Sequence, residues 1–276
     1  VSKFIKNMLK YVDRPSSSGR PVVYYCDSNF KHCSNSVFLL VSYLVLELGW
    51  SIDKAMKPFE SLEESLVRPF RDATFIQPPM HALPVLDCVE GLRRAMRKGW
   101  LNHFNTQEYE RLDNPSEGNI NEICPKFVAF KGPMDDLRYG KAQSLPASFY
   151  ARALQKLDVE VVVRLNEPNT YDASAFEHAG IKHYDLFFDD CTAPSLEIIT
   201  RFLDICDKHK GKIGVHCAAG LGRTGTLIAA WMMKNHAFSA NQAIGFLRVL
   251  RPGSVIGPQQ TFLERLQGAT WTGNAP

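Results

Sequence analysis

The sequence predicts an α/β protein, in which a central sheet is flanked by helices. Downstream of residue 126, short apolar runs of strand length alternate with longer segments whose apolar residues recur at helical spacing. This alternation is typical of a sheet sandwiched between helices. The length of 276 residues and the apolar content of 45% suit two domains, each with a core of its own.

The first hundred residues are expected to form the N-terminal domain. Apolar residues at helical spacing predict a short amphipathic helix at Phe4–Val12, and Val22–Tyr25 has the composition of a strand. A long apolar helix is predicted from about Ser34 to Glu47. A clearer helix, Val85–Lys98, ends in basic residues before Gly99, which is a usual helix C-terminus.

Residues 105–125 differ in composition from the segments on either side. This stretch, NTQEYERLDNPSEGNINEICP, is polar, contains Gly and Pro, and carries five acidic residues and one basic residue. Such a composition is typical of a connection rather than of a core element. We therefore predict an N-terminal domain over residues 1–104, an acidic linker over residues 105–125 and a C-terminal domain over residues 126–276.

The C-terminal domain is expected to alternate strands with helices. The predicted strands are Phe127–Phe130, Val159–Arg164, His183–Phe188 and Ile213–Val215. The predicted helices are Ser195–His209, Arg223–Asn235 and Ser239–Leu250.

A weak internal similarity relates the two halves. Each contains a strand, a cysteine, a loop and an apolar helix, and the alignment places Cys26 on Cys217. The first copy has no glycine in its loop and has His32 where Arg223 falls. Two explanations fit: a shared fold without shared chemistry, and a chance similarity of two strand–loop–helix units.

Composition and charge exclude several classes of protein. The net charge of +3 is too small to predict nucleic-acid or membrane binding, and no apolar run is long enough for a membrane span. The N-terminus lacks a signal-peptide pattern, and the first residue is Val, as expected of a piece of a longer chain. An odd number of cysteines, seven, favours free thiols in a reducing compartment. The oligomeric state is not predicted.

The segment HCAAGLGRTGTL, residues 216–227, lies between a predicted strand and a predicted helix. Backbone N–H groups and the positive end of the helix dipole favour an anion there, and the glycines permit a close approach. Cys217 stands at the mouth of this loop, where thiolate formation is favoured, and Arg223 offers a bidentate guanidinium for phosphoryl oxygens. We predict phosphate binding by the backbone at Ala218, Ala219, Gly220, Leu221, Gly222 and Arg223.

Two simpler interpretations of these residues exist. A single Cys after a strand is usually a small buried hydrophobic residue. Cys206, His209, His216 and Cys217 also lie close in sequence, but adjacent His and Cys residues are not the usual spacing of zinc ligands. The whole string of His, Cys, five residues, Arg, Thr and Gly is more specific than its parts. It favours phosphate chemistry with no metal ion and no cofactor.

The loop resembles the signature of cysteine-dependent protein tyrosine and dual-specificity phosphatases. The segments HYDLFFDDCTAP, RPGSVIGPQQ and LDCVEGLRRAMRKG are similar to the cell-division-cycle-fourteen branch, the proline-directed phosphatases of mitotic exit, and the likeness runs from Val22 to Leu266. The resemblance implies two tandem protein-tyrosine-phosphatase-like domains, the first without the catalytic signature. It also implies a location in the nucleus and cytoplasm or on cytoskeletal structures.

Ester hydrolysis also requires an acid that protonates the leaving oxygen. Asp189 and Asp190 follow a predicted strand, and the resemblance assigns the acid to Asp190, with Asp189 as the alternative. It further implies that Thr224 donates a hydrogen bond to the cysteine sulfur. Of the two glutamines after the turn PGSVIGP, Gln259 rather than Gln260 is expected to position water.

The acidic segment suggests how peptide substrates are selected. Glu110 and Asp113 align with acidic positions that, in the family, line a groove for a basic residue downstream of phosphoserine-proline; a third is replaced by Asn119. A solvated linker is the alternative. The expected function is hydrolysis of phosphoserine, phosphothreonine and phosphotyrosine esters in proteins through a phosphocysteine intermediate.

Two other functions remain open: a phosphoinositide phosphatase, and a catalytically silent phosphopeptide-binding module. Ala218 stands where the family commonly has lysine, and positions 219 and 221 are also uncharged. A multiply phosphorylated headgroup would find no lysine inside this loop. Cys217, Arg223 and Asp190 are all present, which counts against a silent module.

Overall fold

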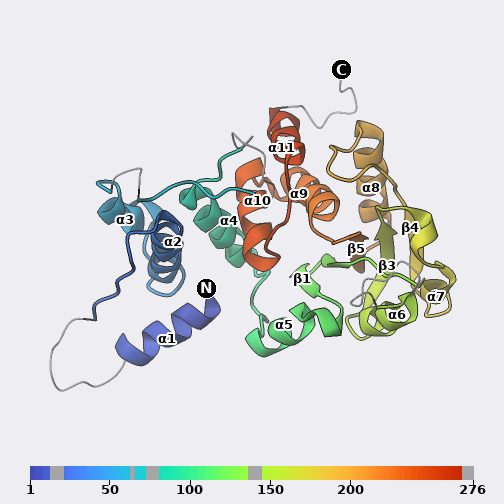
Figure 1. Cartoon of the computed structure of the whole chain (residues 1–276), viewed down its shortest axis with the longest axis horizontal. Coiled ribbons are helices and arrows are strands. Elements are labelled where there is room, and N and C mark those ends of the chain that lie inside the picture. The colour runs from blue at the N-terminus through green and yellow to red at the C-terminus, as the bar shows by residue number, and fades with distance from the viewer. Residues whose placement is uncertain (13–21, 63–65, 73–80, 136–144, 269–276) are drawn as a thin grey trace.

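The computed structural model describes residues 1–12, 22–62, 66–72, 81–135 and 145–268 (Figure 1). The N-terminal half consists of the helices α1 (Ser2–Val12), α2 (Phe30–Leu46), α3 (Ile52–Met56) and α4 (Val85–Arg97). The C-terminal half is built around one sheet that is flanked by helices on both faces. In the described parts of the chain, no helix is long and apolar enough to cross a membrane.

The sheet is mixed and has five strands in the order β1-β2-β5-β3-β4. These are β1 (Ile120–Cys124), β2 (Phe127–Lys131), β3 (Val159–Arg164), β4 (Lys182–Asp185) and β5 (Lys212–Cys217). β1 pairs antiparallel with β2, whereas β2, β5, β3 and β4 run parallel. The parallel strands therefore end at the same edge of the sheet, and β5 carries Cys217 to the middle of that edge.

The two faces of the sheet bury different sets of helices. Along β2, Val128 and Phe130 belong to a core with α6 (Ala147–Gln155) and α7 (Ser174–Glu177). Phe127 and Ala129 belong to the larger core on the other face, because side chains alternate along a strand. That core contains α8 (Leu196–Lys208), α9 (Gly222–His236), α10 (Ala240–Leu250) and α11 (Pro258–Gly268).

The larger core also includes the N-terminal half. α4 lies against α10, and two glycines let the helices approach closely: a Cβ on Gly91 would lie 2.2 Å from the Gln242 carbonyl oxygen, and one on Gly245 2.8 Å from the Cys88 Cα. Trp100 stacks on Phe238 at 5.4 Å between ring centroids. The two halves thus share one hydrophobic core.

We expect Gly245→Ala to destabilise the whole chain. The new methyl group would meet the backbone of α4, and overpacking of this kind costs about 1–3 kcal/mol. This cost offsets the roughly 1 kcal/mol by which alanine favours a helix over glycine. Thermal unfolding should show a lower midpoint for this variant, while Gly268→Ala, with no atom within 4 Å of its Cβ, should not lower it. Equal midpoints for the two variants would contradict close helix packing at Gly245.

Most predicted elements are present. β2 and β3 cover the predicted strands, and β5, α4, α8, α9 and α10 differ from their predicted ranges by only a few residues at their ends. β4 ends at Asp185, three residues earlier than predicted, because the chain then leaves the sheet toward the loop that carries Asp190.

Two predictions fail or change in the structure. Val22–Tyr25 forms no strand: Val23 is 75% exposed and Tyr25 85%, and no strand in the described parts of the chain pairs with this segment. Among the described residues of the N-terminal half there is one isolated β-bridge, Phe70 to Leu83, and no sheet.

The acidic segment 105–125 contains α5 (Thr106–Asp113) and the edge strand β1, so it is a structured part of the C-terminal half.

Candidate active site

The glycine-rich loop joins the central strand to the most buried helix. β5 ends at Cys217, which is 2% exposed, and α9 begins at Gly222. Between them Gly220 has a φ of 68°, and a Cβ there would lie 1.9 Å from the Phe130 carbonyl oxygen. Only glycine fits this position, so the loop is pressed against β2.

The carbonyl groups of the loop are held on its outer side. The Gly132 N–H donates to the Ala218 oxygen at 3.1 Å, and the Gly225 N–H donates to the Leu221 oxygen at 2.9 Å. The guanidinium of Arg251 donates to the oxygens of Ala219 and Gly220. In a trans peptide the N–H points opposite to the C=O, so the N–H groups of residues 219–222 face the other side. None of these four N–H groups has an acceptor among the described residues, so all four are available to bind an anion.

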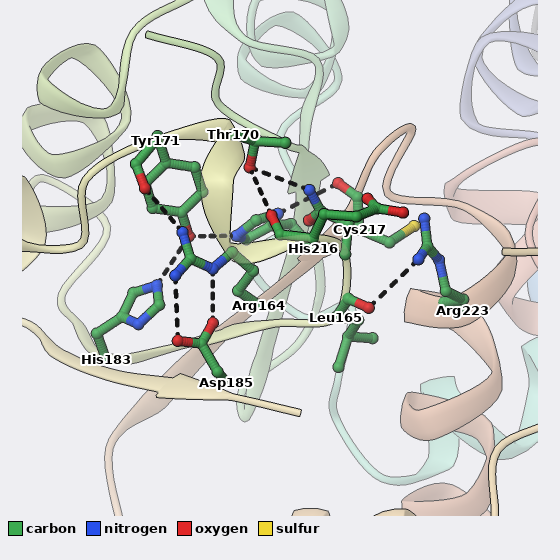
Figure 2. A network of polar contacts seen from close by, with 11 residues as sticks. Arg164, Leu165, Thr170, Tyr171, His183, Asp185, His216, Cys217 and Arg223 are labelled. Atoms are coloured by element: carbon green, nitrogen blue, oxygen red, sulfur yellow. Dashed lines mark hydrogen bonds and ion pairs between the residues drawn. The ribbon is translucent and has the colours of Figure 1, made fainter. Parts of the chain in front are cut away.

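Arg223 lies beneath this loop and is 1% exposed. Its Nη1 donates to the Phe188 oxygen at 2.9 Å and to the Leu165 oxygen at 3.3 Å, which fixes the plane of the guanidinium. Its Nη2 makes no hydrogen bond to the described residues. In Figure 2 the sulfur of Cys217 points toward this guanidinium. The buried Thr224 hydroxyl also has no hydrogen-bond partner in the described parts of the chain. The side chains of Arg223 and Thr224 therefore both keep hydrogen-bond donors that the described residues do not use.

The loop after β4 brings one of the two candidate acids to Arg223. Asp190 Oδ1 lies 3.1 Å from Arg223 Nε, an ion pair without hydrogen-bond geometry, and the aspartate side chain is 61% exposed. Asp189 contributes only its backbone oxygen, which accepts from the Thr192 hydroxyl at 2.8 Å. The structure thus brings Asp190, and not the side chain of Asp189, to the candidate site.

The two glutamines face different parts of the molecule. Gln259 is fully buried against Gly222 and donates from Nε2 to the Thr192 oxygen at 3.0 Å, so it links the acid loop to the start of α9. Gln260 donates instead to Asp72 of the N-terminal half at 2.8 Å. Of the two, Gln259 is the one beside the glycine-rich loop between Cys217 and Arg223, here called the phosphate loop.

A network of buried polar groups stands behind Cys217 (Figure 2). Burial lowers the pKa of His216 to about 3 and that of His183 to about 4, so both rings are neutral at pH 7. Nδ1 of His216 lies 3.2 Å from the Cys217 oxygen, which can only accept, so this nitrogen carries the proton. Nε2 then accepts from the Tyr171 hydroxyl at 2.7 Å. The Tyr171 oxygen in turn lies 2.8 Å from His183 Nε2.

This network orients the end of β5 rather than moving protons. Arg164 anchors it through a bidentate contact with Asp185, at 2.6 and 3.1 Å, and donates to the Tyr171 carbonyl oxygen at 2.9 Å. No sequence pattern predicts the roles of Arg164, Tyr171, His183 and Arg251. Arg251 begins the segment RPGSVIGPQQ, but its approach to the loop depends on tertiary packing.

The acidic residues of the segment 105–125 occupy two environments. Glu110 is 45% exposed on α5 and forms an ion pair with Lys3 of α1. Asp113 accepts a hydrogen bond from the side chain of Asn121 at 3.0 Å, and its backbone oxygen accepts from Asn119. Asn119 and Asn121 both contact Arg251, so Asp113 lies close to the phosphate loop. In the described residues no group of three His, Cys, Asp or Glu side chains could hold a metal ion.

Two family models match this chain. One, "Dual specificity phosphatase, catalytic domain", matches residues 144–270, and the other, "Dual specificity protein phosphatase, N-terminal half", matches residues 1–95. The chain belongs to the dual-specificity protein phosphatase family. Within the part that matches the catalytic-domain model lie Asp190, Cys217, Arg223 and Gln259.

The chain is also similar to curated phosphatases over nearly its whole length. It is 38% identical over 275 residues to human "Dual specificity protein phosphatase CDC14A", covering 98% of this chain and 46% of that protein. It is 36% identical over 260 residues to "Tyrosine-protein phosphatase CDC14" of Saccharomyces cerevisiae, covering 90% of this chain and 47% of that protein. The chain therefore spans about half the length of the curated relatives it matches.

Proposed function

We propose that this chain is a cysteine-dependent protein phosphatase that cleaves phosphate monoesters through a phosphocysteine intermediate. The observation that carries the proposal is the loop between Cys217 and Arg223, whose carbonyls accept hydrogen bonds while its N–H groups have no acceptor among the described residues. Similarity to phosphatases over nearly the whole chain supports the same conclusion. Phosphorylated proteins are the proposed partners.

Each candidate side chain has a role in the proposed reaction. The Cys217 sulfur attacks phosphorus, the S–P bond forms, and the P–O bond to the leaving group breaks. Asp190 gives its proton to the leaving oxygen. Arg223 and the loop N–H groups bind the three equatorial oxygens, on which charge accumulates.

The second step returns the enzyme to its starting state. Gln259 positions a water molecule, Asp190 takes one of its protons, and the water oxygen bonds to phosphorus. The S–P bond breaks with its electron pair on sulfur. Thr224, whose hydroxyl is buried with no other partner among the described residues, donates a hydrogen bond to the departing sulfur. Inorganic phosphate and free Cys217 remain.

Proline-directed phosphoserine or phosphothreonine followed by a basic residue is the proposed preferred substrate, with phosphotyrosine also cleaved. The acidic residues Glu110 and Asp113 support this choice, because α5 lies beside the edge of the sheet that carries Cys217. Lys3 of the same chain already pairs with Glu110, so a substrate lysine would compete with it.

We therefore expect Glu110→Gln to lower the preference for a downstream lysine by no more than about fivefold, since exposed ion pairs contribute about 0.2–1 kcal/mol. Lys3→Gln should change the preference in the opposite direction, because it frees Glu110. The measurement is kcat/KM for paired phosphoserine-proline peptides with lysine or alanine downstream, with a small aryl phosphate as the control. A preference that neither variant alters would remove Glu110 from the substrate groove.

Phosphate release from a panel of substrates tests the proposed function. Hydrolysis of phosphopeptides and of a small aryl phosphate supports it. Hydrolysis confined to phosphoinositides would replace it with a lipid phosphatase, against which the uncharged Ala218, Ala219 and Leu221 argue. Tight binding of phosphopeptides without any release would identify a silent binding module.

The organisation of the whole chain is also a proposal. The match of residues 1–95 to the N-terminal-half model supports a first domain related to phosphatases but without the catalytic signature. Seven free cysteines and the similarity to CDC14 proteins support an intracellular location, in the nucleus and cytoplasm or on cytoskeletal structures.

A further inference from the structure

Arg251, at the end of α10, is the second buried arginine beside the phosphate loop, and it is 2% exposed. All five of its N–H donors are used. Nε donates to the Gly220 oxygen at 2.6 Å, and Nη2 to the Ala219 oxygen at 3.0 Å. The other three bonds go to Asn119 and Asn121, at the start of β1.

The two bonds to the loop fix the direction of two peptide units. The Ala219 carbonyl shares its peptide plane with the Gly220 N–H, and the Gly220 carbonyl shares its plane with the Leu221 N–H. A guanidinium that holds both carbonyls outward therefore holds both N–H groups inward. Gly220 can adopt many dihedral angles, so without this hold its peptide units could rotate.

The opposite side of Arg251 reaches the acidic segment. The amide oxygen of Asn121 accepts from Arg251, and its amide N–H donates to Asp113 Oδ1. Both oxygens of Asn119 accept from Arg251, and its amide N–H donates to the Asp113 backbone oxygen. Asp113 is thus connected to the phosphate loop through two asparagines and one arginine. No carboxylate touches Arg251 directly in the described residues.

Burying the Arg251 guanidinium costs free energy, and the packing of its side chain alone does not explain why an arginine stands here. A buried cation without a facing carboxylate loses its hydration, and neutral carbonyl oxygens must replace it. An apolar side chain of similar volume would fill the same space without that loss. The planar guanidinium of arginine has five N–H donors, and these match the acceptors that the two loop carbonyls and the two asparagines present.

We propose that Arg251 is a positioning residue for the phosphate loop, and that Asn119, Asn121 and Asp113 hold it in place. Arg251 touches no substrate atom; it acts by presenting the Gly220 and Leu221 N–H groups to the phosphoryl oxygens. The proposal rests on the proposed function only for its catalytic readout. In this proposal Asp113 helps to position the phosphate loop, whereas Glu110 does not.

The test compares Arg251→Lys with Arg248→Lys. Arg248 is a half-buried arginine of α10 whose guanidinium donates to the Ser254 and Val255 oxygens and to Gln260, and not to the phosphate loop. Lysine keeps the positive charge but lacks the planar guanidinium and its five donors. The loss of one oxyanion donor typically costs about 10²–10³ in rate. In Arg251→Lys the Gly220 and Leu221 N–H groups are only partly turned away from the phosphate, so kcat on a small aryl phosphate should fall by about 10–100-fold.

Binding of inorganic phosphate, measured by calorimetry, gives a second readout that does not depend on catalysis. Arg251→Lys should weaken it by about 10-fold or more, whereas Arg248→Lys should change it by less than about threefold, although both variants lower the unfolding midpoint. If wild type binds phosphate but hydrolyses nothing, the proposed function fails while the positioning role is still tested.

If Arg251→Lys does not fold, Asn119→Gly tests the same proposal. The φ of Asn119 is 48°, which suits glycine, so the variant keeps the backbone conformation and loses only the side-chain amide that contacts Arg251. A loss of about 3–10-fold in phosphate binding is expected. Unchanged phosphate binding in Arg251→Lys or Asn119→Gly, or an equal loss in Arg248→Lys, would overturn the proposal.

Discussion

Replacement of Cys217 by serine is expected to abolish turnover and to leave substrate binding intact. The serine hydroxyl occupies nearly the same volume but is not ionised at neutral pH, so no nucleophile faces the phosphorus. The N–H groups of the loop and the Arg223 guanidinium are unchanged in this variant, and they provide the binding. Steady-state assays with phosphopeptides, together with direct binding measurements, should separate the two effects.

The wild-type protein should in turn form a covalent phosphocysteine that rapid acid quench traps on a peptide containing Cys217. Three of the other cysteines provide an internal control, because Cys88, Cys124 and Cys206 are buried and burial raises the pKa of each thiol. Undiminished turnover by Cys217→Ser, or phosphate trapped on another cysteine, would falsify the assignment.

The second large effect is expected for Asp190→Asn. General acid catalysis typically contributes about 10²–10⁴ in rate, and asparagine cannot protonate a leaving oxygen. The full loss should appear on phosphoserine and other alkyl esters, whose leaving groups are poor. A smaller loss is expected on aryl esters, whose leaving groups depart without protonation.

Asp189→Asn is the matched control for this experiment. The two aspartates are adjacent and exposed, but only Asp190 lies against Arg223, at 3.1 Å. The control should change kcat by less than about threefold on either kind of ester. A larger loss for Asp189→Asn than for Asp190→Asn would reverse the choice between them.

Periodicity and local signals predicted those parts of the fold that depend on neighbours in sequence. The apolar run Val159–Arg164 is a buried central strand, and the segment before Gly99 is a helix that ends in basic residues. Val22–Tyr25 has the composition of a strand, but a strand needs a partner, and composition does not say whether one is present. β1 was missed because Asn121 and Glu122 make it read as polar, although Asn121 is buried by its bonds to Arg251 and Asp113.

The residues of the candidate site also fall into two groups: those whose proximity follows from the sequence, and those that only the tertiary fold brings together. Cys217 and Arg223 lie on one loop, so their spacing alone predicts that they meet. Asp190 was chosen over its neighbour from the family pattern, and its position near Arg223 depends on how the chain leaves β4. Arg251 was not predicted, because it is separated from Asn119 by more than a hundred residues and only the tertiary fold brings them together.

The glycine crossing of α4 and α10 has a consequence for how this protein can be divided. Because Gly91 and Gly245 leave no room between the helices, the face of α10 that meets α4 is an interior surface and not an interface between separable modules. The C-terminal half expressed alone would expose that surface to water while keeping every residue of its phosphate loop. The N-terminal half thus acts as a folding partner that the C-terminal half cannot replace, and calorimetry should record a single cooperative unfolding transition for the intact chain.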